Sequence, residues 1–378
     1  MLHLPVIISN LLTPIARFPP KPVNYGLLRS ESQEESMLMI RVAFPTKRLT
    51  LTQHKWNTIP EHFCKHTWVF SKKATQCFPE PHIWDHAINL KADAPSTIPG
   101  KIYSLTAQEQ DELKKFMLEH VKKGYIRPSK SPHTTPFFFI KKKDGKLRPV
   151  QDYQQLNQWT IWNTYPLPLI PQLINKVKAW ALFTKFNICW GYNNVRIWWG
   201  DEWKAAFITN EGLFKPTVMF FGLMNSPATF QMMMNAIFKE KLREGWLVIY
   251  IDNMLIATDD NLPFHWTCIY WVLTKLAKHN LFLKPEKGIF EQKRIEFLGI
   301  ILQHSTIHMD PAKTQGVADW PKPTNVMDVH SFLGFTGFYQ YFIPNYSKIM
   351  KPLLLLTRKD TPWHWDAEQK KALNVWKP

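Results

Sequence analysis

An apolar stretch near the middle of the chain, VIYIDNMLIAT at residues 248–258, is interrupted at its centre by Asp252 and Asn253. The β-branched and aromatic residues on both sides favour extended structure, and turn-forming residues follow at 258–261. The pattern predicts a β-hairpin whose tip presents Asp252 and Asn253 in front of a sheet. The same pair is also typical of an ordinary Asx turn between two buried strands, so this stretch alone leaves a site and a simple turn as equal alternatives.

The composition indicates a folded chain with a polyanionic partner. The chain has 378 residues, 45% of them hydrophobic, which is enough for two or three domains. It carries 47 Lys and Arg against 30 Asp and Glu, a formal net charge of +17. Such a charge favours nucleic acid as the partner, with a merely basic soluble protein as the alternative.

Cysteine usage and the N-terminus bear on the compartment. The four cysteines form no CxxC pair and have no histidine at zinc-ligand spacing, which favours a reduced intracellular protein. No segment reaches the roughly 18 apolar residues of a membrane span, and the N-terminal stretch lacks a basic region before its apolar run. We therefore expect neither a signal peptide nor a membrane-spanning segment.

The first third of the chain divides at about residue 100. Residues 1–100 are rich in Pro, Ser, Thr and His without sustained periodicity, and we expect a loosely structured arm there. An amphipathic helix is predicted next, because Thr106 and Glu109 have the spacing of a capping box and Gly124 ends the pattern. Its apolar stripe consists of Leu113, Phe116, Met117 and Val121.

Residues 134–157, TTPFFFIKKKDGKLRPVQDYQQLN, predict a second hairpin with its turn at Asp144 and Gly145. Its five cations are Lys141, Lys142, Lys143, Lys146 and Arg148. They are consistent with a solvated edge whose lysines discourage aggregation. They are equally consistent with a hairpin that folds over a triphosphate, because an Arg fork holds phosphate oxygens bidentately.

Two further segments place polar residues at the ends of apolar runs. Residues 181–197 predict a strand ahead of Asn187, with Tyr192 five residues later. Residues 204–238 predict a hairpin, a turn at Gly222 and then a helix capped by Asn225 or Ser226, with Pro227 at its first position.

These segments carry a resemblance in their order and spacing. The blocks are LRPVQDYQQLN, LFTKFNICWGYNNVRI, FFGLMNSPATFQ, YIDNMLIAT, LFLKPEK, EFLGIIL and SFLGFTGFYQYFIPNYS. Together they resemble the reverse transcriptase domain of gypsy-type (Metaviridae) LTR retrotransposon Pol polyproteins, over roughly residues 84–365. Any one block alone, such as FLG, would be a weak signal.

The resemblance implies an α+β right-hand polymerase whose antiparallel palm sheet carries the YIDN hairpin. It implies fingers and palm over residues 101–300, a thumb-like segment over 301–355, and the start of a connection to ribonuclease H over 356–378. Residues 1–100 would be the remnant of a linker from a protease. An RNA template, a DNA primer and dNTPs are the implied partners, and ribonuclease H, integrase and protease would be companions in the polyprotein. The implied location is intracellular, in cytoplasmic virus-like particles and in the nucleus.

In such enzymes three carboxylates hold two Mg²⁺ ions, and the matching positions here are Asn187, Asp252 and Asn253. An Asn carbonyl supplies an oxygen but no negative charge, and Mg²⁺ prefers hard, charged oxygen ligands. We therefore expect Asp252 to be the one acidic metal ligand and Mg²⁺ binding to be poor. The loss amounts to several kcal/mol of transition-state stabilisation, on the order of 10³-fold in rate.

Other positions match the family more closely. By resemblance Lys142 and Arg148 would contact the triphosphate, Tyr192 would lie beneath the sugar, and Phe221 with Gly222 would line the templating pocket. Ordinary packing is the alternative for Tyr192 and Phe221. For a proton donor to pyrophosphate, Lys287 competes with Lys284, and either lysine is also consistent with a plain surface position.

The aromatic residues after residue 309 have two interpretations. The region predicts two short helices around a Pro-bearing turn, with Phe335, Phe338, Tyr339, Tyr341 and Phe342. They would either pack in the core of the thumb, which their density favours, or stack against a primer–template minor groove.

Three functional alternatives stay open from the sequence. The first is a reverse transcriptase of very weak or no activity, the second a nucleic-acid-binding protein that kept the duplex cleft, and the third a poorly folded pseudogene product. The 17 Trp, several at positions where the family has Arg or another polar residue, fit single C-to-T or G-to-A changes. Mutational decay is therefore our hypothesis for the asparagines, with adaptation as the alternative.

Overall fold

The computed structural model describes residues 59–71, 78–142, 145–311, 315–316 and 319–375. Two compact units divide them. The larger comprises the described parts of Ile40–Leu173 and Thr184–Glu291, and the smaller comprises Ile174–Phe183 and the described part of Gln292–Pro378. Each unit has a core of its own, and each is described separately.

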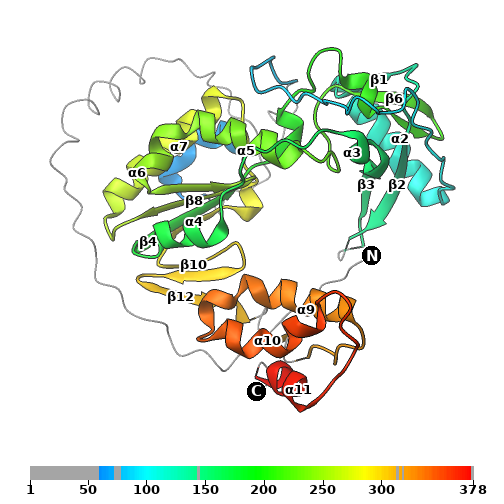
Figure 1. Ribbon diagram of the computed structural model, residues 1–378. Helices are drawn as coiled ribbons and strands as arrows, with labels where there is room; N and C mark the ends of the chain where they lie inside the picture. Colours follow the sequence, from blue (N-terminus) through cyan, green and yellow to red (C-terminus); the bar gives the residue numbers. More distant parts are fainter. Residues whose placement is uncertain (1–58, 72–77, 143–144, 312–314, 317–318, 376–378) are drawn as a thin grey trace. The chain divides into compact units, whose positions relative to one another are not determined.

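A four-stranded sheet with the order β7-β8-β4-β9 forms one half of the larger unit (Figure 1). Its strands are β4 (Leu182–Asn187), β7 (Leu247–Tyr250), β8 (Asn253–Thr258) and β9 (Ile289–Gln292). Helices α5 (Ser226–Ile237) and α7 (Leu262–Lys278) pack on this sheet, and α6 (Lys239–Glu244) leads into β7. The apolar positions of β7 and β8 are buried in the core between sheet and helices.

The hairpin predicted at VIYIDNMLIAT is confirmed. Strands β7 and β8 pair antiparallel, with Tyr250 opposite Asn253 as the last pair, so Ile251 and Asp252 make the turn. Ile251 has a φ of 54°, a left-handed conformation that β-branched residues rarely adopt. A strained turn is therefore built into the tip that presents Asp252.

The segment before residue 100 differs from the loose arm that we expected. The short helix η4 (Glu61–Phe70) places Phe63, Val69 and Phe70 in the core of the four-stranded sheet, where each is fully buried. The sequence concealed this helix because it is a 3₁₀ segment with a kink at His66, which breaks the 3.6-residue period. Residues 1–58 and 72–77 lie outside the described part of the chain.

A five-stranded sheet with the order β1-β6-β5-β2-β3 forms the other half of the larger unit. Its strands are β1 (Ile126–Pro128), β2 (Thr135–Lys141), β3 (Leu147–Gln151), β5 (Phe207–Thr209) and β6 (Gly212–Pro216). The hairpin predicted over residues 134–157 is confirmed as the antiparallel pair of β2 and β3. The short helices α3 (Gln154–Trp159), η6 (Gly191–Asn194) and η7 (Glu202–Ala205) lie in its connections.

Helix α2 (Ala107–Lys122) confirms the predicted capping box, because Thr106 and Glu109 cap each other. Leu113 and Met117 are buried as expected, but the prediction was wrong for Val121, which is exposed. His120 is buried one position earlier, where its ring stacks on Phe116 and its Nδ1 lies 2.8 Å from the Phe116 carbonyl oxygen. The apolar stripe thus ends one turn sooner than the sequence indicated.

The smaller unit holds a three-stranded antiparallel sheet and a helical cluster. The strands are β10 (Arg294–Phe297), β11 (Ile300–Gln303) and β12 (Thr306–Met309), and α4 (Ile170–Val177) ends in this unit. The helices are α9 (Val326–Phe338), η9 (Gln340–Phe342), α10 (Tyr346–Leu356) and α11 (Ala367–Asn374). The two helices predicted after residue 309 are therefore confirmed as α9 and α10.

The aromatic residues of this region are mostly core. Tyr339 and Phe342 are buried, Phe335 packs on the helical core, and Phe338 is partly exposed. The position of the Tyr341 side chain lies outside the described part. Packing within the unit therefore explains these aromatics better than stacking on a duplex does.

No helix among the described residues has the length and apolar character needed to cross a bilayer. Cys64, Cys189 and Cys268 form no disulfide, and Cys77 lies outside the described ranges.

Candidate active site

The structure brings Asn187, Asp252 and Asn253 together at one end of the four-stranded sheet. Asn187 ends β4, and β4 lies beside β8, which begins at Asn253. The Asn187 Nδ2 lies 3.1 Å from Asp252 Oδ2 and 3.1 Å from Asn253 Oδ1. The Asn253 Nδ2 donates to Asp252 Oδ1 at 3.1 Å. Residues 65 positions apart in the sequence therefore form one polar cluster.

Gln231 on α5 holds the main chain of the hairpin tip. Its Oε1 accepts a hydrogen bond from the Ile251 N–H at 2.7 Å, and its Nε2 donates to the Ile249 carbonyl at 3.3 Å. The Gln231 side chain is fully buried. Gln231 therefore forms hydrogen bonds with the main chain on both sides of Tyr250 and supports the left-handed turn at Ile251.

Of the two candidate lysines, the structure places Lys284 in the cluster. The Lys284 ammonium donates to Asn187 Oδ1 at 2.7 Å, and the main-chain N–H of Lys284 donates to the main-chain carbonyl of Asn187 at 2.9 Å. Lys287, at the end of η8 (Pro285–Lys287), is exposed. A role for Lys287 stays a prediction.

Arg148, Phe221 and Tyr192 pack one on the next beside this cluster, with the two aromatic ring planes tilted by 56°, and this group is called the stack below. The Arg148 guanidinium lies 4.6 Å from the centre of the Phe221 ring, and the Phe221 and Tyr192 ring centres are 4.9 Å apart. Burial, followed by the charges of Asp252 and Tyr250, raises the pKa of Tyr192 to about 12, so its hydroxyl stays protonated at neutral pH. Phe221 is 47% exposed, so one ring of the stack faces solvent.

Gly222 follows Phe221 in a conformation that requires glycine. Its φ is 103°, and a Cβ built there would lie 3.0 Å from the Gln151 carbonyl oxygen. The close approach joins the end of β3 to the loop that carries Phe221. Three of the residues predicted near the nucleotide, Arg148, Phe221 and Gly222, therefore lie together.

Lys142 lies just after β2, where its N–H donates to the Lys146 carbonyl at 2.9 Å. Its side chain is exposed. Lys143 and Asp144, in the same turn, lie outside the described part. A phosphate contact by Lys142 therefore stays a prediction.

The donor set of the cluster does not fit a two-metal centre. It contains one carboxylate, two amides and an ammonium, and the amide Nδ2 of Asn187 points at the oxygens that a cation would need. Elsewhere in the described ranges, no three His, Cys, Asp or Glu side chains lie close enough to hold a metal ion.

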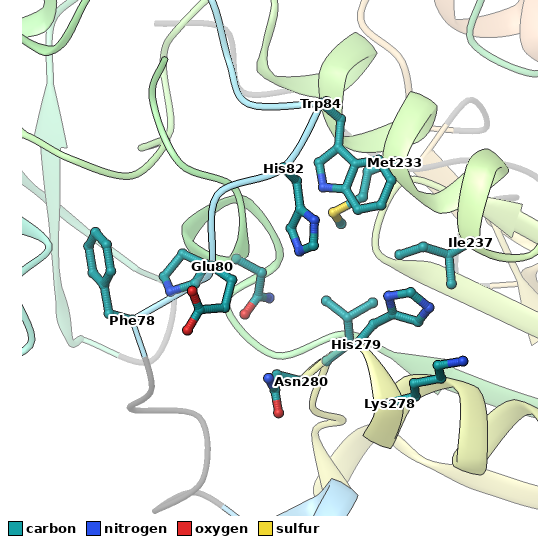
Figure 2. A pocket seen from close by; sticks show the side chains of 12 residues that line it. Phe78, Glu80, His82, Trp84, Met233, Ile237, Lys278, His279 and Asn280 are labelled. Atoms are coloured by element: carbon teal, nitrogen blue, oxygen red, sulfur yellow. The ribbon is translucent and has the colours of Figure 1, made fainter. Parts of the chain in front are cut away.

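A separate hollow of about 160 Å³ lies between the Phe78–Trp84 segment and the C-terminal end of α7 (Figure 2). His82 and Trp84 stack with ring centres 4.6 Å apart on one side, and Lys278, His279 and Asn280 line the other. None of the predicted site residues lines it. The segment over residues 72–77, which adjoins this hollow in the chain, is not among the described residues.

Gln231 is the site residue that the sequence analysis missed. It ends the FFGLMNSPATFQ block, so its identity was visible, but a single polar residue on an apolar helix does not reveal which main-chain groups it contacts. The feature that marks Gln231 as a site residue is its burial, and only the tertiary structure shows that burial.

Comparison with known proteins shows the family to which the central part of the chain is similar. Residues 140–302 match the family described as reverse transcriptase (RNA-dependent DNA polymerase). The Transposon Tf2-7 polyprotein of Schizosaccharomyces pombe is 34% identical over 276 residues, 73% of this chain and 21% of that protein. The retrovirus-related Pol polyprotein from transposon 297 of Drosophila melanogaster is 35% identical over 281 residues, 73% of this chain and 26% of that protein. The chain thus spans about a quarter or less of these relatives.

Solved structures agree on the fold. The foamy viral protease-reverse transcriptase in complex with double-stranded DNA gives a TM-score of 0.71 at 20% identity, over 95% of this chain and 61% of that chain. The same viral protein in complex with an RNA/DNA hybrid gives 0.68 at 19% identity, over 95% and 47%. The α+β polymerase fold expected from the sequence is confirmed. Residues 140–302 therefore belong to the reverse transcriptase family, and the chain carries a reverse transcriptase domain of the kind found in LTR retrotransposon Pol polyproteins.

Proposed function

We propose that this chain is an RNA-directed DNA polymerase domain that still binds a primer–template duplex but transfers nucleotides at a severely reduced rate. The family match and the polyprotein relatives support the ancestral activity. The viral structures that share the fold hold an RNA/DNA hybrid and double-stranded DNA. The formal charge of +17 supports a polyanionic partner of the same kind.

One observation carries the loss of rate: Asp252 is the single carboxylate among the three positions where the family holds Mg²⁺. Nucleotidyl transfer places negative charge on the attacking oxygen, the phosphorus and the pyrophosphate, and divalent ions neutralise that charge. Asn187 and Asn253 add no negative charge, and the Asn187 Nδ2 is a donor aimed at the remaining oxygens. The rate deficit should be on the order of 10³-fold or more, about 4 kcal/mol of transition-state stabilisation.

The nucleotide side of the site keeps its residues. Arg148 is the candidate for the triphosphate, because its planar fork lies over Phe221 next to Tyr192. Tyr192 is the candidate for the sugar contact. Lys142 and Lys287 are candidates for phosphate contacts through the family resemblance alone. The stack supports the proposal that the chain still binds a nucleotide although nucleotidyl transfer is severely slowed.

The organisation of the chain follows from the same proposal. Residues 101–300 would form fingers and palm, 301–355 a thumb-like segment, and 356–378 the start of a connection toward ribonuclease H. Ribonuclease H, integrase and protease would be companions in a longer polyprotein. A cytoplasmic virus-like particle, with access to the nucleus, is the proposed location.

Binding of a labelled RNA/DNA hybrid tests the proposal, with fluorescence anisotropy as the readout. Affinity should fall steeply between about 50 and 200 mM salt, with a log–log slope of about −0.9 for each phosphate neutralised. The matched variant Arg148→Ala should lose the extra affinity that a complementary dNTP gives to the complex, while an Arg127→Ala variant on β1 should keep it. No binding at low salt, or binding without salt dependence, would contradict the proposal.

A cooperative thermal unfolding transition of the same preparation is the necessary control. A poorly folded pseudogene product would lack such a transition, so absence of binding by a cooperatively folded chain counts against the proposed function alone.

A further inference from the structure

The Lys284 ammonium occupies the polar cluster at the hairpin tip. An antiparallel bridge between Ile188 and Leu283 fixes its position, and the Lys284 N–H bonds the Asn187 carbonyl at 2.9 Å. The side chain is half-buried and returns to the same residue, with Nζ 2.7 Å from Asn187 Oδ1. Main chain and side chain therefore hold Lys284 on Asn187 at two points.

This contact decides which way the Asn187 amide faces. An ammonium has three donors and no acceptor, so it can face only the oxygen of the amide. The Asn187 Nδ2 is then directed at Asp252 Oδ2 and Asn253 Oδ1, both at 3.1 Å. An aspartate at position 187 would present a second oxygen there instead of a donor.

The cluster is complete without any added ion. Asp252 accepts one hydrogen bond at each carboxylate oxygen, one from Asn187 and one from Asn253. The amide oxygens of Asn187 and Asn253 accept from Lys284 and Asn187, respectively. All four side-chain oxygens of the three residues therefore already accept a hydrogen bond, and a cation would have to share these oxygens with the donors around them.

The charges also balance. One carboxylate lies near one ammonium, so the site sums to zero, whereas three carboxylates with the same ammonium would sum to −2 and would need cations to lie close together. Burial lowers the pKa of Lys284, and the negative charge of Asp252 opposes that shift.

We propose that Lys284 is an internal cation that takes the place of the metal, so that the hairpin tip of this chain is structurally complete without divalent ions. The inference rests on the proposed placement of the site at Asn187, Asp252 and Asn253. Beyond that placement, the inference assigns Lys284 as a positioning residue and states that the hairpin tip is stable without a bound divalent ion. Its physical core is that a donor-only side chain orients the Asn187 amide, and that amide then directs a donor, where the family has a carboxylate, at Asp252 Oδ2.

Thermal unfolding in EDTA and in Mn²⁺ tests the proposal, because stability requires neither nucleic acid nor turnover. The native chain should give the same Tm in both buffers. The Asn187→Asp, Asn253→Asp variant should have a Tm lower by several degrees in EDTA, because three carboxylates then repel one another, and Mn²⁺ should raise it again. A native chain whose Tm rises with Mn²⁺ as much as that of the variant would overturn the proposal.

Variants of the lysine itself keep the test decisive if the double variant does not fold. Lys284→Met should lower the Tm by several degrees in both buffers, because Asn187 Oδ1 and Asp252 lose their cation. Lys284→Arg, which is also a donor-only cation, should retain most of the native Tm. The matched control Lys287→Met, three residues further along and exposed, should leave the Tm unchanged. A Lys284→Met Tm equal to that of the native chain would overturn the proposal.

The two proposals fail separately. Loss of hybrid binding with this pattern of Tm values intact would refute the proposed function and leave the internal cation standing. Salt-dependent hybrid binding by a chain whose Tm ignores Lys284 would do the reverse.

Discussion

Replacing Gln231 by Met should loosen the hairpin tip that carries Asp252. Met has nearly the shape of Gln but neither accepts from the Ile251 N–H nor donates to Ile249 and Asn235. Three hydrogen bonds of a fully buried side chain are lost, and at about 1 kcal/mol each the free energy of unfolding should fall by about 3 kcal/mol. That loss corresponds to a Tm lower by about 6–12 °C.

Two measurements check this prediction together. Differential scanning calorimetry gives the change in Tm, and hydrogen–deuterium exchange of the 248–254 peptide reports on the Ile251 amide, which should exchange faster in Gln231→Met. The control is Gln155→Met, an exposed glutamine whose replacement should change the free energy of unfolding by less than about 0.5 kcal/mol. A Gln231→Met Tm within a degree of the native value would refute the claim that the Gln231 hydrogen bonds stabilise the hairpin tip.

Two further predictions concern buried groups of the larger unit. Burial lowers the pKa of His86 and of His265 to about 4. Between pH 6.5 and 4 the unfolded chain therefore binds protons that the folded chain does not. The free energy of unfolding, measured in urea, should be flat above pH 6.5 and should fall by up to about 3 kcal/mol for each histidine as the pH falls to 4. Constant stability across that range would contradict the assignment. Phe63→Ala should lower the free energy of unfolding by about 3–5 kcal/mol, because Phe63 is fully buried against Tyr270 and Phe290. Glu61 is an exposed neighbour, and the control variant Glu61→Ala should leave the free energy of unfolding unchanged. Equal values for the two variants would mean that the helix before residue 100 is not part of the core.

Local signals predicted the elements that depend on local physics. The capping box of Thr106 and Glu109 gave the start of α2, and the alternation around Asp252 gave the hairpin of β7 and β8. Both signals act within a few residues, so the sequence contains them directly. The resemblance then supplied the order of these elements.

Contacts between distant segments could not be predicted in the same way. Lys284 and Gln231 reach Asn187 and Ile251 only after strands from three parts of the chain have paired, and no spacing rule relates them. The burial of Phe63 and His120 has the same origin, because the neighbouring elements decide which face of a short or terminal segment is covered. The sequence indicated which residues carry chemistry, and the tertiary structure showed which groups support them.

Primer extension on an RNA template tests the central claim most directly. The native chain and the Asn187→Asp, Asn253→Asp variant would be compared in Mg²⁺ and in Mn²⁺, at concentrations where both bind the hybrid. We expect the variant to extend the primer at least about 10³-fold faster than the native chain. Extension by the native chain at a rate equal to that of the variant would contradict the claim that the two asparagines silence this site.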